Sequence, residues 1–406
     1  MSTAVASDAV LERVVRDETA HLVATLHCIL GDLDVAEEAV ADAVVEALKT
    51  WRRNGIPDRP GGWLLTAARH NALDRLRRDS RYRDKLALLA GGLTETAPAP
   101  AGGQDDRLGL IFGCCHPALA RPAQLALTLR AVLGLTTAEI ARASLTSESA
   151  IAQRIVRAKR KIVQAGIPVR VPGVDEMTER LDTVLTVVYL AYNEAYLATG
   201  GPDPTRRDLG DDAIWLAGVV SSALPREPEA LGLLALLSLH HARAASRFDG
   251  EGHLILLADQ DRTAWDAAAI QAAIRLIERA AALRRPGRYQ LQATIAACHA
   301  EAPSWAVTDW LQILTLYDLL LRHDPSPVVR LNRAIALAQV EGPARALAEL
   351  DTFAAALSSY YLLHATRAQL LRELGRGPEA RVADQAALAL TGNTAERHLL
   401  TERLRA

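Results

Sequence analysis

The stretch LTTAEIARASLTSESAIAQRIVRAKRKI, residues 135–162, decides how this chain can fold. Thr136 and Thr137 can cap the short helix AEIARA, and the polar residues at 144–146 break it. Ser147 can cap a second, longer helix whose isoleucines recur on one face, while glutamine, arginine and lysine occupy the other. The stretch predicts a helix-turn-helix whose outer face can reach both the phosphates and the base edges of a duplex.

The composition around this motif is that of a helical protein. Of the 406 residues, 50% are apolar but only 4% are aromatic, and the apolar surplus is Ala and Leu. These residues favour helices over sheets, so we expect an all-α protein of two or three domains. The net charge of −2 argues against a uniformly basic coating protein and against an acidic disordered chain.

Charge is spread unevenly along the chain. Residues 1–50 carry 3 Lys/Arg and 10 Asp/Glu (net −7), and residues 51–85 carry 10 and 4 (net +6). Residues 142–161 have a net charge of +5, whereas residues 167–406 sum to −5 from 24 basic and 29 acidic residues. Any nucleic-acid surface is therefore expected within the first 165 or so residues.

Two linkers divide the chain into blocks. Residues 90–104 (AGGLTETAPAPAGGQ) carry a single charge and many small residues, which predicts a flexible tether. The prolines of GIPVRVPG, residues 166–173, end the preceding helix. We expect domains at 1–89, 105–166 and 174–406.

The first block should hold an acidic helix followed by a basic one. Apolar residues recur at helical spacing throughout 36–51, and Asp34 followed by Glu37 suggests the N-cap. A loop rich in Pro and Gly leads to WLLTAARHNALDRLRR, residues 63–78, which is amphipathic and basic.

The third block contains an internal repeat. Three residues recur at an offset of 34, the period of a tetratricopeptide-type helix pair: Ala334, Leu337 and Ala346 return as Ala368, Leu371 and Ala380. Helix pairs of this period stack on one another and create a concave surface suited to a peptide or partner helix.

Several motifs in order resemble a bacterial RNA polymerase sigma factor of the extracytoplasmic-function (ECF) class. The segments are GDLDVAEEAVADAVVEAL (31–48) and PGGWLLTAARHNALDRLRR (60–78) for region 2, and DDRLGLIFGCCHPAL (105–119) with residues 135–162 for region 4. VVYLAYNEAYLATGG (187–201) and EPEALGLLALLSLHHARAASR (227–247) are similar to the tetratricopeptide-like, DUF6596-type extension of one subgroup. The resemblance covers nearly the whole chain.

The resemblance implies an all-α fold with two small helical sigma domains, region 2 and the region 4 helix-turn-helix, followed by a TPR-like domain. It implies a transcription initiation factor that binds core RNA polymerase through the clamp helices and flap, recognises promoter DNA and helps to melt the −10 region. Such a protein is not an enzyme, needs no cofactor and works in the cytoplasm. The extension is expected to regulate activity in cis, while the promoter, the inducing signal and any anti-sigma factor stay open.

The matched motifs assign roles to individual residues. The polymerase-binding set is Val40, Asp42, Val44 and Leu48. The −10 set is Trp63, Arg69, His70, Asn71, Asp74, Arg75 and Arg78. The −35 set is Thr137, Ser147, Ser149, Gln153, Arg154, Arg157, Lys159 and Lys161, the first members nearest the bases and the last on phosphates.

Two other classes of function remain open from the sequence. One is a helix-turn-helix regulator with a TPR-like ligand or partner domain that binds DNA without polymerase. The other is an enzyme or metal site built on Asp259, Asp261 and Asp266 with Arg262 and Trp265. A separate trio in a predicted helix either lines a groove or stabilises its hairpin: Tyr192, Asn193 and Glu194. Together with Asp259, Asp261, Arg262 and Trp265 this trio forms what we call the regulatory cluster. Because no nucleophile and base accompany these carboxylates, we favour a loop cap or salt-bridge knot that packs the extension.

The cysteines and histidines point to core positions. Cys114-Cys115-His116 offers too few ligands for a metal, so a buried, reduced thiol pair is the preferred interpretation. No CxxC pair occurs, and the longest apolar runs fall far short of the roughly 18 residues that a membrane span needs.

Overall fold

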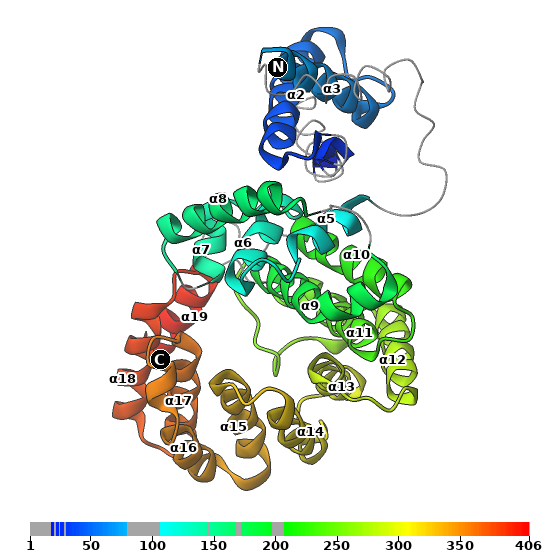
Figure 1. Ribbon diagram of the computed structural model, residues 1–406. Helices are drawn as coiled ribbons and strands as arrows, with labels where there is room; N and C mark the ends of the chain where they lie inside the picture. The colour runs from blue at the N-terminus through cyan, green and yellow to red at the C-terminus, as the bar shows by residue number, and fades with distance from the viewer. Residues whose placement is uncertain are drawn as a thin grey trace. The chain divides into compact units, whose positions relative to one another are not determined.

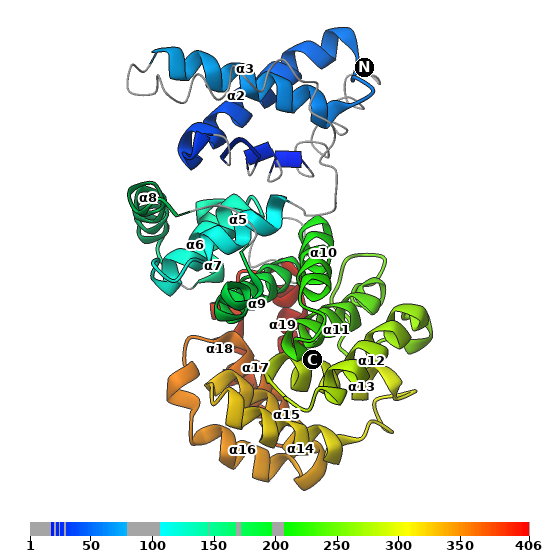
Figure 2. The same ribbon diagram turned by 45° about the vertical axis from the view of Figure 1, so that its right-hand side comes forward.

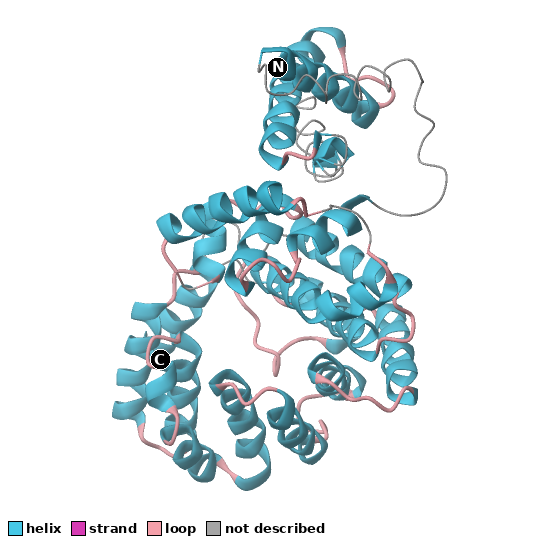
Figure 3. Cartoon of the chain, in the orientation of Figure 1, coloured by secondary structure: helices cyan, strands magenta, loops and turns pink. Residues whose placement is uncertain are grey.

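In the computed structural model the chain is built from helices (Figures 1 and 3). The structure describes residues 18, 19, 22, 23, 25–27, 30–78, 106–144, 146–167, 172–196 and 207–405. Within these residues no strand forms, and one isolated β-bridge joins Phe248 and Leu254. The all-α prediction is confirmed for the part of the chain described, and the tether predicted at 90–104 lies outside it.

The chain divides into two compact units, residues 1–187 and 188–406. The division falls inside one helix, α9 (Val174–Tyr196), and not at the proline-containing segment 166–173.

After the helical residues described between 18 and 30, the first unit contains an antiparallel helical pair, α2 (Leu33–Asn54) and α3 (Pro60–Arg78). The N-cap is Asp32, whose carboxylate accepts from the backbone N–H groups of Asp34 and Val35. The prediction of Asp34 as the cap was therefore wrong by two residues, because Asp32 stands where the backbone is still extended. The apolar stripe buries Ala36, Ala39, Ala43, Ala47 and Trp51.

The second part of this unit is the predicted helix-turn-helix. It comprises α5 (Asp106–Cys114), α6 (Arg121–Ala131), α7 (Thr137–Ala143) and α8 (Glu148–Ala165). A capping box starts α7: the Glu139 carboxylate accepts from the Thr136 N–H at 2.6 Å, and the Thr136 hydroxyl accepts from the Glu139 N–H at 3.2 Å. Ser147 caps α8 by accepting from the N–H of Ala150, as the sequence predicts.

The first half of α9 is tied to this helix-turn-helix by two arginines. The Arg180 side chain is 7% exposed and donates to the carbonyl of Phe112 at 3.0 Å. On the surface, Arg121 of α6 pairs with Asp182 at 2.8 Å and donates to the Thr186 hydroxyl at 3.3 Å. Since a buried guanidinium is stable only with hydrogen-bond partners, the Phe112 carbonyl fixes where this part of α9 docks.

The second unit is a succession of antiparallel helices that follow an arc (Figure 2). After α9 come α10 (Arg207–Ala223), α11 (Pro228–Ala242), α12 (Ala267–Ala282), α13 (Arg288–Glu301), α14 (Trp310–His323), α15 (Pro327–Glu341), α16 (Pro343–Asp351), α17 (Tyr361–Glu373), α18 (Gly377–Leu390) and α19 (Thr394–Arg405). The long connection between α11 and α12 runs on the inside of this arc (Figure 1).

The helix α11 is the most apolar element of the second unit and is buried along most of its length. The side chain of Glu229, in its first turn, caps the start of α13 by accepting from the N–H groups of Tyr289 and Gln290, both at 3.0 Å. One turn later Gly232 lies so close to α13 that a Cβ would stand 2.6 Å from the Gln290 nitrogen. This contact explains why a glycine occupies the middle of a helix, where it is otherwise unfavourable.

The 34-residue repeat corresponds to two consecutive helical hairpins, α15–α16 and α17–α18. All six repeated residues are buried, with at most 4% of any one exposed. Ala346, Ala368, Leu371 and Ala380 share one apolar core with Phe353. Small residues at these positions let neighbouring helices approach closely, as the period predicts.

Candidate nucleic-acid interface

The outward face of α8 carries most of the residues predicted for the −35 element. Gln153, Arg157 and Lys161 are exposed, one helical turn apart, and Arg154 beside them is half-buried. Arg157 donates to the Gln153 side-chain oxygen at 3.1 Å, which orients the amide along the helix. The buried side of α8 consists mainly of Ile151, Ile155, Ala158 and Ile162. The helix thus presents polar and cationic groups outward over an apolar base.

The start of this helix adds short polar side chains. Ser147 and Ser149 are exposed and their hydroxyls lie 3.2 Å apart at the first turn, where the Ser147 hydroxyl also accepts from the Ala150 N–H. Thr137, at the start of α7, is half-buried. A helix N-terminus with small hydroxyl groups suits a phosphate or a base edge.

Lys159 occupies a different place from the one predicted. Its side chain is 10% exposed, and its ammonium donates to Asp34 and Glu37 of α2, each at 2.8 Å. Desolvation opposes the charge of Lys159, but the two carboxylates outweigh it and raise its pKa. In this conformation Lys159 does not face outward with Arg157 and Lys161, so its assignment to phosphate contact needs correction.

The predicted −10 residues lie along α3. Trp63 is half-buried and meets Trp51 edge to face, with ring centroids 5.5 Å apart. His70 and Asp74 are exposed, while Arg69 and Asn71 are half-buried. Arg78 ends the helix, and its side chain lies outside the described residues. The aromatic and polar groups occur together on one helix, which is what holding an unstacked strand requires.

Arg75 joins two sets that the sequence analysis kept apart. It was assigned to the −10 element, yet its guanidinium pairs with Glu38 and, at 2.8 Å, with Asp42 of α2. The hydrogen bond to Asp42 raises the pKa of Arg75. Asp42 belongs to the polymerase-binding set, so the acidic rim of α2 is partly neutralised by its own domain.

The remaining polymerase-binding residues are unequally placed. Val40 is 1% exposed and packs in the core of the helical pair, which corrects its assignment to a contact surface. Val44 and Leu48 are half-buried, and Asp42 is exposed. Val45, which the sequence analysis passed over, is 48% exposed next to them and adds apolar surface to this face. Val40 and Val45 lie on different faces of α2, because five residues do not make a whole number of helical turns. Plotting α2 at 3.6 residues per turn would therefore have placed Val45 on the exposed face and Val40 on the buried one.

The part of the regulatory cluster at 261–265 forms a capped turn that contacts α13. Asp261 caps a short 3-10 turn by accepting from the N–H and hydroxyl of Thr263, at 2.9 and 2.7 Å. Arg262 donates to the carbonyls of His299 and Ala302 at 2.6 Å each and lies over the Trp265 ring. These contacts are those of a loop that packs against α13, which is the interpretation preferred from the sequence.

The other members of that cluster are dispersed. Tyr192 is buried and stacks with His240, whereas Asn193 and Asp259 are exposed. The Glu194 side chain lies outside the described residues. Among the residues that the structure describes, no three His, Cys, Asp or Glu side chains gather as a metal site.

The adjacent cysteines are buried thiols, as predicted. Cys114 and Cys115 are 0% and 1% exposed, and burial raises the pKa of both. The Cys115 thiol lies 3.6 Å from the Thr128 hydroxyl inside the helix-turn-helix. Protonated thiols in this setting are unreactive.

Arg180 is the residue that the sequence analysis missed. Its partner is a backbone carbonyl 68 residues away, so no side-chain pattern announces the contact. Glu176, Glu179 and Asp182 surround Arg180 in the sequence, so the local pattern is that of an exposed helix face.

The arrangement of helices agrees with family comparisons over most of the chain. Residues 14–82 match the family described as Sigma-70 region 2, and residues 110–162 match Sigma-70, region 4. Residues 180–281 match DUF6596, a family of unknown function. The chain belongs to the sigma-70 family. It is an ECF-like sigma factor with a DUF6596 extension, and its region 2 and region 4 domains serve promoter recognition.

An uncharacterized protein of Rhizobium meliloti (strain 1021) is 45% identical over 372 residues, which is 90% of this chain and 88% of that protein. No solved structure matches the chain. In the described part of this sigma factor, no helix is long and apolar enough to cross a membrane. Sigma-70 domains act with core RNA polymerase and promoter DNA, and both partners follow from the two domain matches.

Proposed function

We propose that this sigma factor reads the −35 element with the exposed face of α8, engages the −10 element with α3, and is regulated in cis by its extension. The polymerase clamp helices would contact the face of α2 that carries Asp42, Val44 and Leu48, and the flap would contact region 4. The protein would act in the cytoplasm, where core polymerase is found, and would have no catalytic activity of its own.

The observation that best supports the proposed −35 contact is the exposed polar face of α8. Gln153 is an exposed neutral amide one turn before Arg157, so it can pair with a base edge while Arg157 and Lys161 hold phosphates. Lys159 would join them only if its contact with Asp34 and Glu37 opened.

The docking of α9 on region 4 supports cis regulation. The contacts of Arg180 with Phe112 and of Asp182 with Arg121 lie in the first unit, although α9 continues as the first helix of the extension. A change in the extension that displaced α9 would remove a hydrogen bond from a region 4 carbonyl and expose the apolar surface beneath it. The helix thus gives the extension a physical route to the DNA-binding domain.

Run-off transcription with core polymerase and a pool of promoters tests the function. Transcripts that require the full chain, and that are lost on Gln153→Ala with Lys161→Ala, are expected. The matched control is Arg275→Ala, which removes an exposed arginine from α12 of the extension. Duplex binding that needs no polymerase, without such transcripts, would instead support a helix-turn-helix regulator with a TPR-like ligand domain.

Two truncations test the regulatory route. A chain ending at Ala165 loses all of α9, whereas a chain ending at Val187 keeps Arg180 and Asp182. We expect transcription by both to differ from that of the full chain, and Arg180→Met to shift it in the same direction as the shorter truncation. Identical transcription and stability in all four proteins would show that the extension does not regulate.

A further inference from the structure

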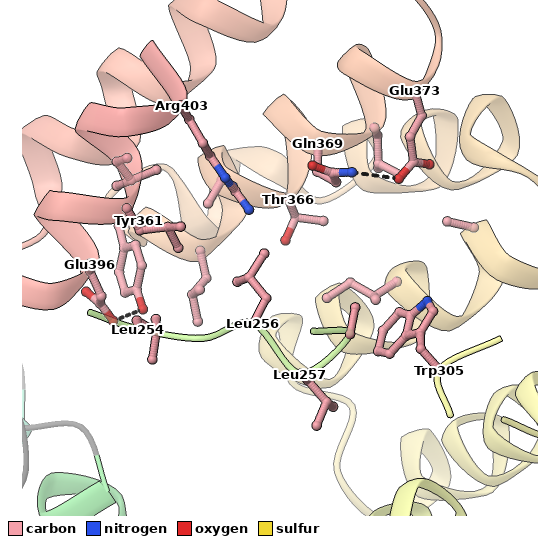
Figure 4. A pocket seen from close by; sticks show the side chains of 18 of the residues that line it. Leu254, Leu256, Leu257, Trp305, Tyr361, Thr366, Gln369, Glu373, Glu396 and Arg403 are labelled. Atoms are coloured by element: carbon pink, nitrogen blue, oxygen red, sulfur yellow. Dashed lines mark hydrogen bonds between the residues drawn. The ribbon is translucent and has the colours of Figure 1, made fainter. Parts of the chain in front are cut away.

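A cavity of about 420 Å³ lies within the second unit, on the inside of the arc of helices. Its walls come from the 254–258 part of the α11–α12 connection, from α15, from α17 and from α19, with Trp305 closing one side (Figure 4). This volume is in the range of sites for small molecules. Every lining residue belongs to one compact unit, so the cavity is a feature of the extension alone.

Most of the wall is aliphatic. Leu256 and Leu362 remain 36% and 37% exposed although they face the cavity, and Leu399 and Leu400 of α19 lie between its two polar ends. Apolar surface left uncovered in a concave site gains free energy when an apolar group displaces water from it.

One cation points into this apolar space. Arg403 extends from α19 toward Leu256 and Thr366 (Figure 4). Among the residues that the structure describes, no side chain makes a hydrogen bond or ion pair with its guanidinium. Burial lowers the pKa of Arg403, with Asp259 and Asp384 near enough to favour the charge, but Asp384 is already paired with Arg372. A partly desolvated cation of this kind is stabilised by an anion that accepts its hydrogen bonds.

The two carboxylates that line the cavity accept hydrogen bonds from side chains other than Arg403. Glu396 accepts from the hydroxyls of Tyr361 and Thr391, at the other end of α19. Glu373 is exposed at the rim and accepts from the Gln369 amide at 2.9 Å. Neither carboxylate compensates Arg403, so the two ends of the cavity differ in charge.

We propose that this cavity binds a small amphipathic organic anion, whose apolar body lies against Leu256, Leu362 and Leu399 and whose carboxylate or similar head pairs with Arg403. The extension would then be a ligand-sensing domain, a role that goes beyond the cis regulation proposed above. The α11–α12 connection forms part of the cavity wall. A ligand bound in the cavity would therefore contact a segment that begins at the end of α11.

Isothermal titration of the full chain with octanoate, octanol and octylammonium tests the assignment, because the three probes share one tail and differ in head-group charge. We expect octanoate to bind at least about tenfold more tightly than octanol, the difference that one charge-assisted hydrogen bond supplies. Octylammonium should bind weakest. No octanoate binding at millimolar concentration, or equal affinity for the three probes, would overturn the proposal.

Variants locate the site. Arg403→Leu should reduce the preference for octanoate over octanol to within about twofold, while Arg405→Leu, the same change at an exposed position of the same helix, should leave it intact. Ala365→Phe should abolish binding of both by filling the cavity. Octanoate should also slow hydrogen exchange in residues 254–259 and in α19 of the wild type. Unchanged selectivity in Arg403→Leu, or protection confined to other helices, would refute this location whether or not Ala365→Phe folds.

Discussion

Single residues in this sigma factor are fixed by close approaches that no local pattern reveals. Gly232 is a glycine because the backbone of Gln290 occupies the place of a side chain. Arg180 and Arg262 both donate to backbone carbonyls of distant segments. In each case the residue type follows from its tertiary partner, so the sequence alone gives the residue without its reason.

Gly232→Ala should destabilise the extension by about 1–3 kcal/mol, because the new methyl group would press on main-chain atoms that cannot rotate away. Gly218→Ala is the control, since nothing lies within 4 Å of a Cβ there. It should be neutral or stabilising by up to about 1 kcal/mol. Urea unfolding followed by hydrogen exchange of α11 peptides measures both, and equal effects of the two changes would contradict the packing argument.

His240 should make the extension less stable in acid. Burial, together with Arg243 and Arg247, lowers its pKa from 6.5 to about 3. Between these values the unfolded chain binds a proton that the folded chain does not, so stability falls as the pH drops below 6.5. The loss at pH 5 is at most about 2 kcal/mol, because pH 5 lies only about 1.5 pH units below the ordinary pKa of histidine.

His240→Phe keeps a ring against Tyr192 and should flatten this pH dependence. His241→Gln, on the exposed side of the same helix, should retain it. The readout is the difference in urea midpoint between pH 7 and pH 5 in each protein. A dependence as steep in His240→Phe as in the wild type would assign the acid sensitivity to other groups, such as His299, whose pKa is lowered to about 4.

At the scale of the element, local sequence predicted much and failed where distant partners intervene. The start of α8 at Ser147, the buried isoleucines and the 34-residue hairpins were predicted correctly, because capping and periodicity are short-range properties. The sequence wrongly predicted that Lys159 faces outward, because helical periodicity gives no information about carboxylates more than 120 residues away. The Arg403 cavity was missed for the same reason: its walls come from five separate stretches of chain.

The helix α8 should divide its work between specificity and affinity. Lys161→Ala should weaken promoter binding by holoenzyme for all sequences and lower the slope of log K against log salt by about 1. Gln153→Ala should instead relax discrimination at one base pair, by about 1–3 kcal/mol. Lys161 is a cleaner choice than Arg157, which also bonds to Gln153.

Fluorescence anisotropy of labelled promoter duplexes at several salt concentrations separates the two effects, with Arg275→Ala as the charge-matched control. A Gln153→Ala variant that loses affinity equally for every base pair would show that the amide contacts the backbone. A Lys161→Ala variant with an unaltered salt slope would remove Lys161 from the phosphate contacts.

At the scale of the whole molecule, the proposed promoter contacts require the first unit to change shape. The −10 and −35 elements lie about 25 base pairs apart, or about 85 Å of duplex. The longest helix of region 2, α2, has 22 residues and spans about 33 Å. If α3 and α8 occupy these two elements as proposed, the contact of Lys159 with Asp34 and Glu37 should open.

Lys159→Met should therefore favour the open form, with a modest gain in holoenzyme affinity of about 2- to 5-fold, equivalent to about 0.5–1 kcal/mol. Energy transfer between dyes at Glu46 and Gln164, both exposed, reports the opening directly. Transfer should be lower for Lys159→Met than for the wild type in the free protein, and equally low for both in holoenzyme. High transfer retained in the wild-type holoenzyme would contradict the requirement for opening.

The helix α9 also constrains how such a gene can change over generations. A crossover that exchanged extensions between relatives would have to fall before Val174 or after Tyr196, because a junction inside α9 would join halves of two different helices. Arg121 and Asp182 should then vary together in descent, each charge reversal answered by the other. Arg180 needs no such partner, since every residue at position 112 offers the same carbonyl. The boundary between the two units lies inside a helix, and we expect this to limit domain shuffling within the lineage.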